Sequence, residues 1–209
     1  MKKGKIAVLA SGGIDSNVLL AELARRGHAI YPVYTRFGLI WEKAELHWLK
    51  RYLRALPPKL RRRIRPLTIL NQPVCDLYRN GWALTGRGTP GYRSDDRKVY
   101  LPGRNLLFLS KAAPFCVLRG IRAIAVGTLV SNPFPDASKA FFQSFERSAS
   151  IALKSPFKIL TPFSGLKKRQ VIRKGRGLPL HLSFSCLAPR GYKVCGRCNK
   201  CAEREKSFS

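Results

Sequence analysis

The chain has 209 residues, of which 45% are hydrophobic and 10% aromatic, values typical of a globular protein with one buried core. No apolar run approaches the roughly 18 residues of a membrane span and no signal peptide precedes Lys5, so we expect a cytoplasmic protein without a membrane partner. Forty Lys and Arg against 11 Asp and Glu give a net charge of +29, which favours anionic partners: nucleotides or, as an alternative, weakly bound nucleic acid.

A short apolar run, a glycine turn and a helical pattern open the chain. Residues 6–10 are all apolar, which suits a strand buried on both faces of a parallel sheet. Residues 11–16, SGGIDS, then lead into a helix. Backbone N–H groups at such a junction converge with the positive end of the helix dipole, and glycine allows the positive φ or close approach that a phosphate needs. We therefore predict a phosphate site formed by Ser11, Gly12, Gly13, Asp15 and Ser16, with Asp15 capping the helix or holding a cation.

This loop matches neither of two common nucleotide-binding motifs. The GK[ST] ending of a Walker A loop is absent, and so is the GxGxxG spacing of dinucleotide-binding proteins. The loop does resemble the SGGxDS pyrophosphate loop of the N-type ATP pyrophosphatases, which split ATP into AMP and pyrophosphate while adenylating a substrate. That resemblance implies binding of ATP with Mg²⁺. The alternative is an ordinary strand–turn–helix junction with Asp15 as N-cap.

Further along the chain, predicted strands and helices alternate. The strands are expected at residues 29–34, 66–70 and 121–126, and the helices at residues 41–56, 104–118, 141–153 and 166–174. Residues 71–103 are rich in Gly and are expected to form a long loop that covers an active site or binds substrate. The alternation predicts an α/β fold with a doubly wound, mostly parallel sheet.

The predicted helix at residues 104–118 begins with a cation, Arg104. A positive charge in the first turn of a helix opposes the helix dipole, so we expect a bound anion to hold this side chain. Arg104 is therefore a candidate for the site that binds ATP.

Four of the six cysteines are grouped near the C-terminus. Cys186, Cys195, Cys198 and Cys201 have the spacing C-x8-C-x2-C-x2-C, with which four thiolates can enclose one tetrahedral Zn²⁺. An iron–sulfur cluster is the alternative, because C-x2-C-x2-C also occurs in ferredoxins. We expect a structural zinc site, and we place the boundary between an ATP-binding domain (1–180) and a zinc-binding segment (181–209) just before it.

Both ends of the chain together resemble the 7-cyano-7-deazaguanine synthase (QueC) family. The segments LPGRNLLFLS at 101–110 and PFSGLKKRQVI at 162–172 add to the loop and the cysteine tail, so similarity covers about the first forty residues and most of the chain from residue 101. The resemblance implies an adenine nucleotide α-hydrolase-like fold. It also places Lys168 on a lysine of the family motif and makes Asp136 the candidate for contact with a substrate base.

The resemblance further implies a reaction. The carboxylate of 7-carboxy-7-deazaguanine attacks the α-phosphate of ATP, ammonia displaces AMP to give an amide, and a second ATP drives dehydration to the nitrile in queuosine biosynthesis. Charge that develops on the phosphates has to be neutralised, a role that suits the loop amides, Arg104 and Lys168, while Asp15 works with the metal. A homodimer is also implied.

Two segments, at 34–38 and 134–138, depart from the family pattern, so the acceptor substrate stays open. One alternative is an amidating enzyme that acts on another carboxylate. A second is a tRNA-modifying enzyme with the same loop, a thiolase or lysidine synthetase type, which the +29 charge supports. A third is a zinc-ribbon nucleic-acid binder on a degenerate α/β domain, which the intact SGGIDS loop argues against.

Overall fold

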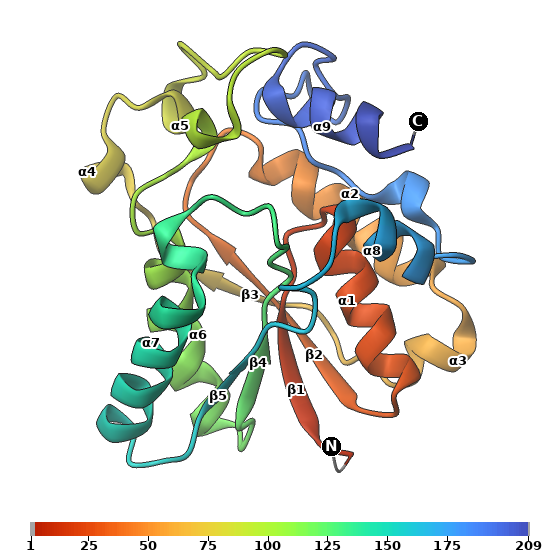
Figure 1. The fold of residues 1–209 in the computed structure, drawn as a ribbon, viewed down its shortest axis with the longest axis vertical. Coiled ribbons are helices and arrows are strands. Elements are labelled where there is room, and N and C mark those ends of the chain that lie inside the picture. The colour runs from red at the N-terminus through yellow and green to blue at the C-terminus, as the bar shows by residue number, and fades with distance from the viewer. Residues whose placement is uncertain (1–2, 209) are drawn as a thin grey trace.

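The computed structural model describes residues 3–208, and at its centre is a parallel five-stranded sheet (Figure 1). The strands are β1 (Lys5–Leu9), β2 (Ala29–Arg36), β3 (Thr68–Asn71), β4 (Ala123–Ala125) and β5 (Lys158–Leu160). Their order across the sheet is β3-β2-β1-β4-β5, so the chain builds one half outward from β1 and then returns to build the other. Val8 of β1 lies between Pro32 and Ala125 of its two neighbours. This arrangement confirms the predicted α/β fold.

Helices cover both faces of the sheet (Figure 1). On one face lie α1 (Ile14–Arg25), α2 (Glu42–Ala55), α3 (Pro58–Arg61) and α8 (Lys168–Lys174), and on the other lie α6 (Arg104–Leu118) and α7 (Lys139–Ala152). Side chains of a strand alternate between its two faces, and β1 follows this rule: Ile6 and Val8 pack into the core under α1, whereas Ala7 and Leu9 pack into the core under α6. Two apolar cores therefore hold the sheet from both sides.

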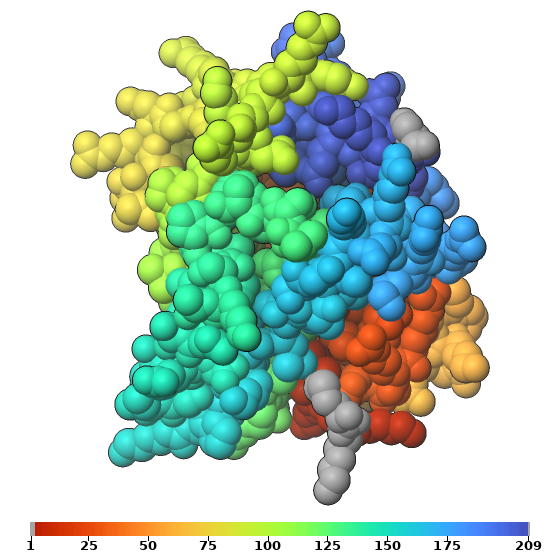
Figure 2. Space-filling model, viewed as in Figure 1, coloured from red at the N-terminus to blue at the C-terminus, as the bar shows by residue number. Residues whose placement is uncertain are grey.

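A third apolar core lies beyond the carboxyl ends of the strands. Here residues 71–103, which contain α4 (Cys75–Tyr78), α5 (Trp82–Thr85) and the 3-10 helix η1 (Asp96–Val99), meet the C-terminal segment with helix α9 (Asn199–Phe208). The two segments lie side by side in Figure 2, and an isolated bridge joins Gly91 to Cys198. Two more 3-10 helices are η2 (Pro135–Ala137) and η3 (Leu180–Leu182). Residues 71–103 are therefore a loop with short helices, packed onto the C-terminal segment.

Outside residues 71–103, two α-helices and one β-strand were not predicted. One helical turn, α3, follows the break after α2, because proline is well tolerated at the first position of a helix. Strand β5 has only three residues, too few for a recognisable pattern, and its identity as a strand comes from its register with β4. Helix α9 was not predicted, since its first turn coincides with the cysteine ligands.

The C-terminal segment packs against the rest of the chain. Phe184 and Cys186 share the third core with Phe37 and Trp41, and the backbone N–H of Phe184 donates to the carbonyl of Gly12 (2.8 Å). A division of the chain at residue 180 remains a prediction. Among residues 3–208 we find no helix with both the length and the apolar character needed to cross a bilayer.

Candidate active site

The predicted phosphate loop connects β1 to α1 at the centre of the sheet. Gly12 has φ +78°, a backbone conformation that residues with a Cβ rarely adopt, and Gly13 is the N-cap of α1. The hydroxyl of Ser16 donates to the carbonyl of Gly13 (3.1 Å), and its oxygen lies 3.2 Å from that of Ser11. Asp15 lies in the first turn of α1 and does not cap it. The two hydroxyls therefore lie beside the start of the helix, where its dipole favours an anion.

Contacts from distant parts of the chain fix the shape of this loop. The side-chain amide of Asn17 and the backbone N–H of Phe184 both donate to the carbonyl of Gly12, at 3.0 and 2.8 Å. The hydroxyl of Tyr52 on α2 donates to the carbonyl of Asn17 (2.8 Å). The carbonyl of Gly12 therefore faces away from the space that a phosphate would occupy, and the loop is held from α2 and from the C-terminal segment.

We expect Gly12→Ala to show how much this geometry matters. A Cβ at residue 12 would lie 3.4 Å from the carbonyl oxygen of Glu45 and would strain the positive φ. The free energy of unfolding should fall by about 1–2 kcal/mol, and ATP-dependent AMP formation by more than about tenfold. The matched control is Gly120→Ala, at φ +66° after α6 with no neighbouring atom within 4 Å, which should lose similar stability and keep AMP formation. Equal losses of AMP formation in both variants would contradict a special role for the loop.

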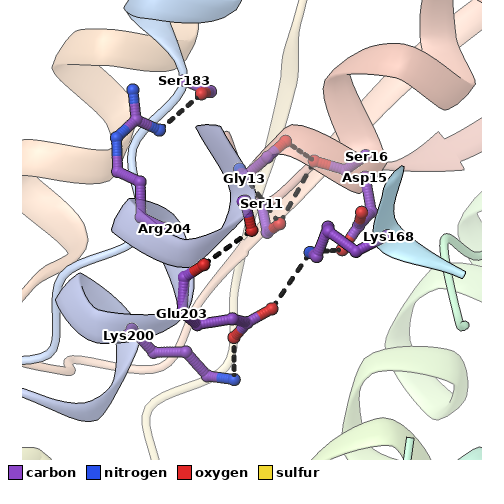
Figure 3. Close-up of polar contacts among 10 residues, drawn as sticks. Ser11, Gly13, Asp15, Ser16, Lys168, Ser183, Lys200, Glu203 and Arg204 are labelled. Atoms are coloured by element: carbon purple, nitrogen blue, oxygen red, sulfur yellow. Dashed lines mark hydrogen bonds and ion pairs between the residues drawn. The ribbon is translucent and has the colours of Figure 1, made fainter. Parts of the chain in front are cut away.

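A chain of ion pairs lies beside the loop and joins three helices (Figure 3). Nζ of Lys168, the first residue of α8, is 2.6 Å from Oδ2 of Asp15 and 3.0 Å from Oε1 of Glu203 on α9. Oε2 of Glu203 is in turn 2.6 Å from Nζ of Lys200. Residues 15 and 168 were expected in the site, and the structure brings them together; Lys200 and Glu203 were not expected there.

The protonation of the two carboxyls differs because their surroundings differ. Burial raises the pKa of Asp15, and Lys168 only partly compensates. Burial alone would also raise the pKa of Glu203, but Lys200 and Lys168 together outweigh it and hold the pKa at about 2. Glu203 is thus a fixed anion at neutral pH that positions Lys168 against Asp15.

The low pKa of Glu203 predicts that this residue contributes to stability in a pH-dependent way. A carboxyl whose pKa is 4.5 when unfolded and about 2 when folded stabilises the folded state above pH 4.5, and this contribution is lost as the pH falls toward 2. As the pH falls from about 5 to about 3, we therefore expect Glu203→Gln to lose less unfolding free energy than the wild type, measured by urea denaturation. The control is Glu22→Gln, which removes a carboxylate paired with Arg26 at the other end of α1. A wild-type pH dependence that survives in Glu203→Gln would contradict the prediction.

A cavity of about 210 Å³ opens between the loop and the carboxyl ends of β2 and β4. Four polar atoms that line it are buried and have no hydrogen-bond partner among residues 3–208: Oδ1 of Asp15, Oγ1 of Thr35, Nε of Arg104 and Oγ1 of Thr128. Buried polar groups without partners are costly, so such a group of atoms indicates a ligand that satisfies them. Hydroxyls, a guanidinium and a carboxylate are the groups that hold phosphates with a divalent cation.

Arg104 lines this cavity, as predicted for a residue that binds an anion. Its guanidinium lies over the rings of Phe108 (5.3 Å) and Trp41 (5.8 Å), and within residues 3–208 no carboxylate forms an ion pair with it. Its charge lowers the pKa of the buried Glu45 carboxyl, which lines the same cavity. The cation is therefore available to a ligand.

Asp136, expected to contact a substrate base, makes a structural contact. Its Oδ2 accepts from the backbone N–H of Asn105 (2.9 Å), one of the free donors at the start of α6. Asp136 is not among the residues that line the 210 Å³ cavity, although its partner Asn105 is. A role for Asp136 toward the substrate remains a prediction.

The four predicted metal ligands form one cluster. The sulfurs of Cys186, Cys195, Cys198 and Cys201 all lie within 4.8 Å of one another, with three pairs at 3.5, 3.9 and 4.0 Å. Tetrahedral Zn²⁺ with Zn–S bonds of about 2.3 Å requires sulfurs about 3.8 Å apart, so the ligands fit this geometry. Backbone N–H groups of Leu187 and Cys195 point at two of the sulfurs (3.4 and 3.2 Å). Such donors stabilise the thiolate form of cysteine, which is the form that binds a metal cation.

Helix α9 connects this cluster to the ion pairs at the loop. Helix α9 begins within the cluster, and its residues Lys200 and Glu203 flank the ligand Cys201. Arg204 fastens the same helix, since its guanidinium donates to the hydroxyl of Ser183 (2.6 Å; Figure 3). On the other side of the cluster, Nε1 of Trp48 donates to the carbonyl of Tyr192 (2.7 Å). The cysteine segment therefore connects α2, the loop and α9.

Sequence analysis overlooked three residues of the site: Lys200, Glu203 and Glu45, the last of which lines the cavity. One signal for Glu45 is present in the sequence, because it lies in the same helical stripe as the buried Ala44 and Leu49. A charged residue in an apolar stripe indicates a special role. No comparable local signal places Glu203 at the loop, since Lys168, the partner that joins it to the loop, is 35 positions away and Asp15 is farther still.

A parallel sheet whose central strand ends in a glycine loop, with ion pairs and a polar cavity at the same edge, defines an α/β protein with the PP-loop fold. Solved structures share this fold. A 4-thiouridine synthetase in complex with RNA and bound ATP aligns at a TM-score of 0.51 and 20% identity, over 98% of this chain and 50% of that one. A predicted subunit of a tRNA methyltransferase from Methanocaldococcus jannaschii aligns at 0.52 and 16%, over 81% and 72%.

The chain belongs to the QueC family. The family model described as "Queuosine biosynthesis protein QueC" matches residues 5–209. The 7-cyano-7-deazaguanine synthase 1 of Desulfitobacterium hafniense (strain Y51) is 32% identical over 213 residues, which cover 100% of this chain and 93% of the relative. A 7-cyano-7-deazaguanine synthase of Leptospira interrogans is 32% identical over 219 residues, with 98% and 86% covered. The resemblance found from the loop and the cysteine tail is confirmed.

Proposed function

We propose that this protein is an ATP-dependent ligase that converts 7-carboxy-7-deazaguanine and ammonia to 7-cyano-7-deazaguanine through an adenylated intermediate. The observation that carries the proposal is the intact SGGIDS loop beside a cavity with unpartnered polar atoms, in a chain of the QueC family. The names of the relatives in that family support the same substrate class.

In this proposal the chain's own residues orient ATP and neutralise charge. The amides of Gly12 and Gly13 and the hydroxyls of Ser11 and Ser16 bind the pyrophosphate portion. Arg104 faces the α-phosphate, where a carboxylate attacks and negative charge develops. Lys168 balances Asp15 beside the leaving pyrophosphate. No side chain has to be a nucleophile, because the substrate carboxylate itself attacks.

Two metals belong to the proposal. Mg²⁺ would be held by Asp15, whose Oδ1 is buried without a hydrogen bond, and would supply charge neutralisation to the phosphates. Zn²⁺ would be held by the four clustered cysteines and would supply a fixed cross-link, with no role in the reaction steps.

The experiment is to measure AMP and pyrophosphate release from ATP with Mg²⁺ and ammonium, with and without 7-carboxy-7-deazaguanine, and to record product masses. AMP that depends on this substrate, together with the mass of the nitrile, supports the proposal. AMP formation that ignores this substrate, or none, would contradict it and leave another carboxylate as the acceptor, since residues 34–38 and 134–138 depart from the family pattern.

The net charge of +29 favours one second candidate, a tRNA-modifying PP-loop enzyme. Its basic side chains would bind RNA in a salt-dependent way, so a gel shift with tRNA at low salt tests it. A shift that disappears as salt rises supports tRNA as a partner, and no shift at low salt contradicts it. We also propose a cytoplasmic homodimer, which gel filtration tests by an apparent mass near twice the 23.5 kDa of one chain.

A further inference from the structure

Glu45 is a buried carboxyl that neither the phosphate loop nor the ion-pair chain uses. It lies on α2, is 8% exposed, and lines the 210 Å³ cavity together with Ser11, Asp15 and Arg104. Its Oε2 accepts from the hydroxyl of Tyr34 on β2 (2.7 Å). Oε1 has no hydrogen bond to any of residues 3–208. One oxygen is thus fixed and the other remains available in the cavity.

The groups around Glu45 determine the pH range in which its carboxyl is charged. Burial raises its pKa to about 7, Arg104 on α6 and the hydrogen bond from Tyr34 lower it, and Glu42 on its own helix raises it. At neutral pH such a carboxyl exchanges a proton readily in both directions, which is what a general base requires. If Glu45 served only as the hydrogen-bond partner of Tyr34, it would not have to line the cavity or to exchange a proton near neutral pH.

The proposed reaction has a step that needs a base. Ammonium, the form that predominates at neutral pH, has no lone pair and cannot attack an acyl-adenylate. Among the ionisable side chains that line the cavity, Arg104 is a cation, and Asp15 pairs with Lys168 through Oδ2 while its Oδ1 is the proposed ligand of Mg²⁺. Tyr34 donates its own proton to Glu45. Glu45 is therefore the carboxylate in this cavity that remains free to accept a proton from nitrogen.

We propose that Glu45 binds the ammonium ion and is the general base of the amide-forming step, an inference that rests on the proposed function. Ammonium gives one proton to Oε1 of Glu45 and becomes ammonia. The nitrogen lone pair then forms the C–N bond at the acyl carbon, the C–O bond to AMP breaks, and AMP leaves with that electron pair. The nitrogen releases its second proton to solvent. One acyl-adenylate and one ammonium thus give one amide, one AMP and two protons.

Glu45→Gln separates this role from a structural one, because adenylation and the amide-forming step can be assayed separately. Three assays are used: pyrophosphate exchange, amide formation from ammonium, and hydroxamate formation from hydroxylamine. Carboxylate-dependent exchange of pyrophosphate into ATP reports adenylation and the integrity of the site, and should stay within about threefold of wild type. Amide formation from ammonium at neutral pH should fall by about 100-fold or more. Hydroxylamine is a weaker base than ammonia and is largely unprotonated at neutral pH. Since it needs no base to free its lone pair, hydroxamate formation should stay close to wild type.

Tyr34→Phe is the matched variant, since it keeps the carboxylate and removes the hydrogen bond that lowers its pKa. In wild type the amide-forming rate should rise with pH through about 7, and in Tyr34→Phe the midpoint should move to higher pH. An unmoved midpoint contradicts the proposal.

The remaining outcomes are also decisive. Equal losses in all three assays of Glu45→Gln would mean that Glu45 only organises the cavity, and unchanged amide formation from ammonium would exclude it as the base. If the wild type shows no carboxylate-dependent exchange at all, the proposed function itself fails, and this inference fails with it.

Discussion

Lys168→Met is expected to reduce carboxylate-dependent AMP formation by at least about 100-fold, because it removes the cation that positions Asp15 at the loop. Lys168 is the shared partner of Asp15 and Glu203, at 2.6 and 3.0 Å. Methionine is unbranched and nearly as long as lysine, and it removes the charge. Asp15 would then lose its counter-ion and Glu203 would keep only Lys200, which should lower the free energy of unfolding by about 1–3 kcal/mol.

The control for this variant lies on the same helix. Lys174 is the last residue of α8 and pairs with Glu22 at 3.8 Å, away from the loop. Lys174→Met should change both AMP formation and stability little, as is usual for an exposed ion pair. Steady-state AMP release and urea denaturation of both variants check the prediction. An active Lys168→Met protein would show that Asp15 needs no positioning cation.

Cys198→Ser is expected to have the other large effect, on the metal, on α9 and on activity together. Four-thiolate sites release the metal readily once a ligand is lost, and bound zinc contributes directly to folding. Helix α9 begins at this cluster and carries Lys200 and Glu203, so its release would disconnect Lys168 from one of its two partners. Bound zinc should fall from about one per chain to near zero, the C-terminal segment should become sensitive to protease, and AMP formation should fall by more than about tenfold.

Elemental analysis of the wild type decides at the same time between zinc and an iron–sulfur cluster. The matched control is Cys116→Ser, since Cys116 is also buried but lies in α6 outside the cluster. This variant should lose some stability and keep its metal. If Cys198→Ser keeps an ordered C-terminal segment and full activity, then the cluster does not position α9.

The chemistry of both ends of the chain follows from local sequence, because the interacting groups are neighbours along the backbone. The phosphate loop needs only one strand, two glycines and the first turn of a helix, all within residues 5–16. Three of the four metal ligands lie within seven consecutive residues. Patterns of this length are visible in the sequence, and the alternation of strands and helices between them predicts the parallel sheet.

Which distant side chains complete the site depends on tertiary packing. Asp15 and Lys168 are 153 positions apart, and Glu203 joins them because the cysteine cluster turns the chain back toward the loop before α9 begins. Glu45 enters the cavity because α2 packs across the loop at Gly12. Local sequence patterns were thus sufficient to predict the fold class, the phosphate loop and the four cysteines that could bind a metal. The ion-pair chain and the buried base depend on how separate helices pack, and local patterns carry no record of that packing.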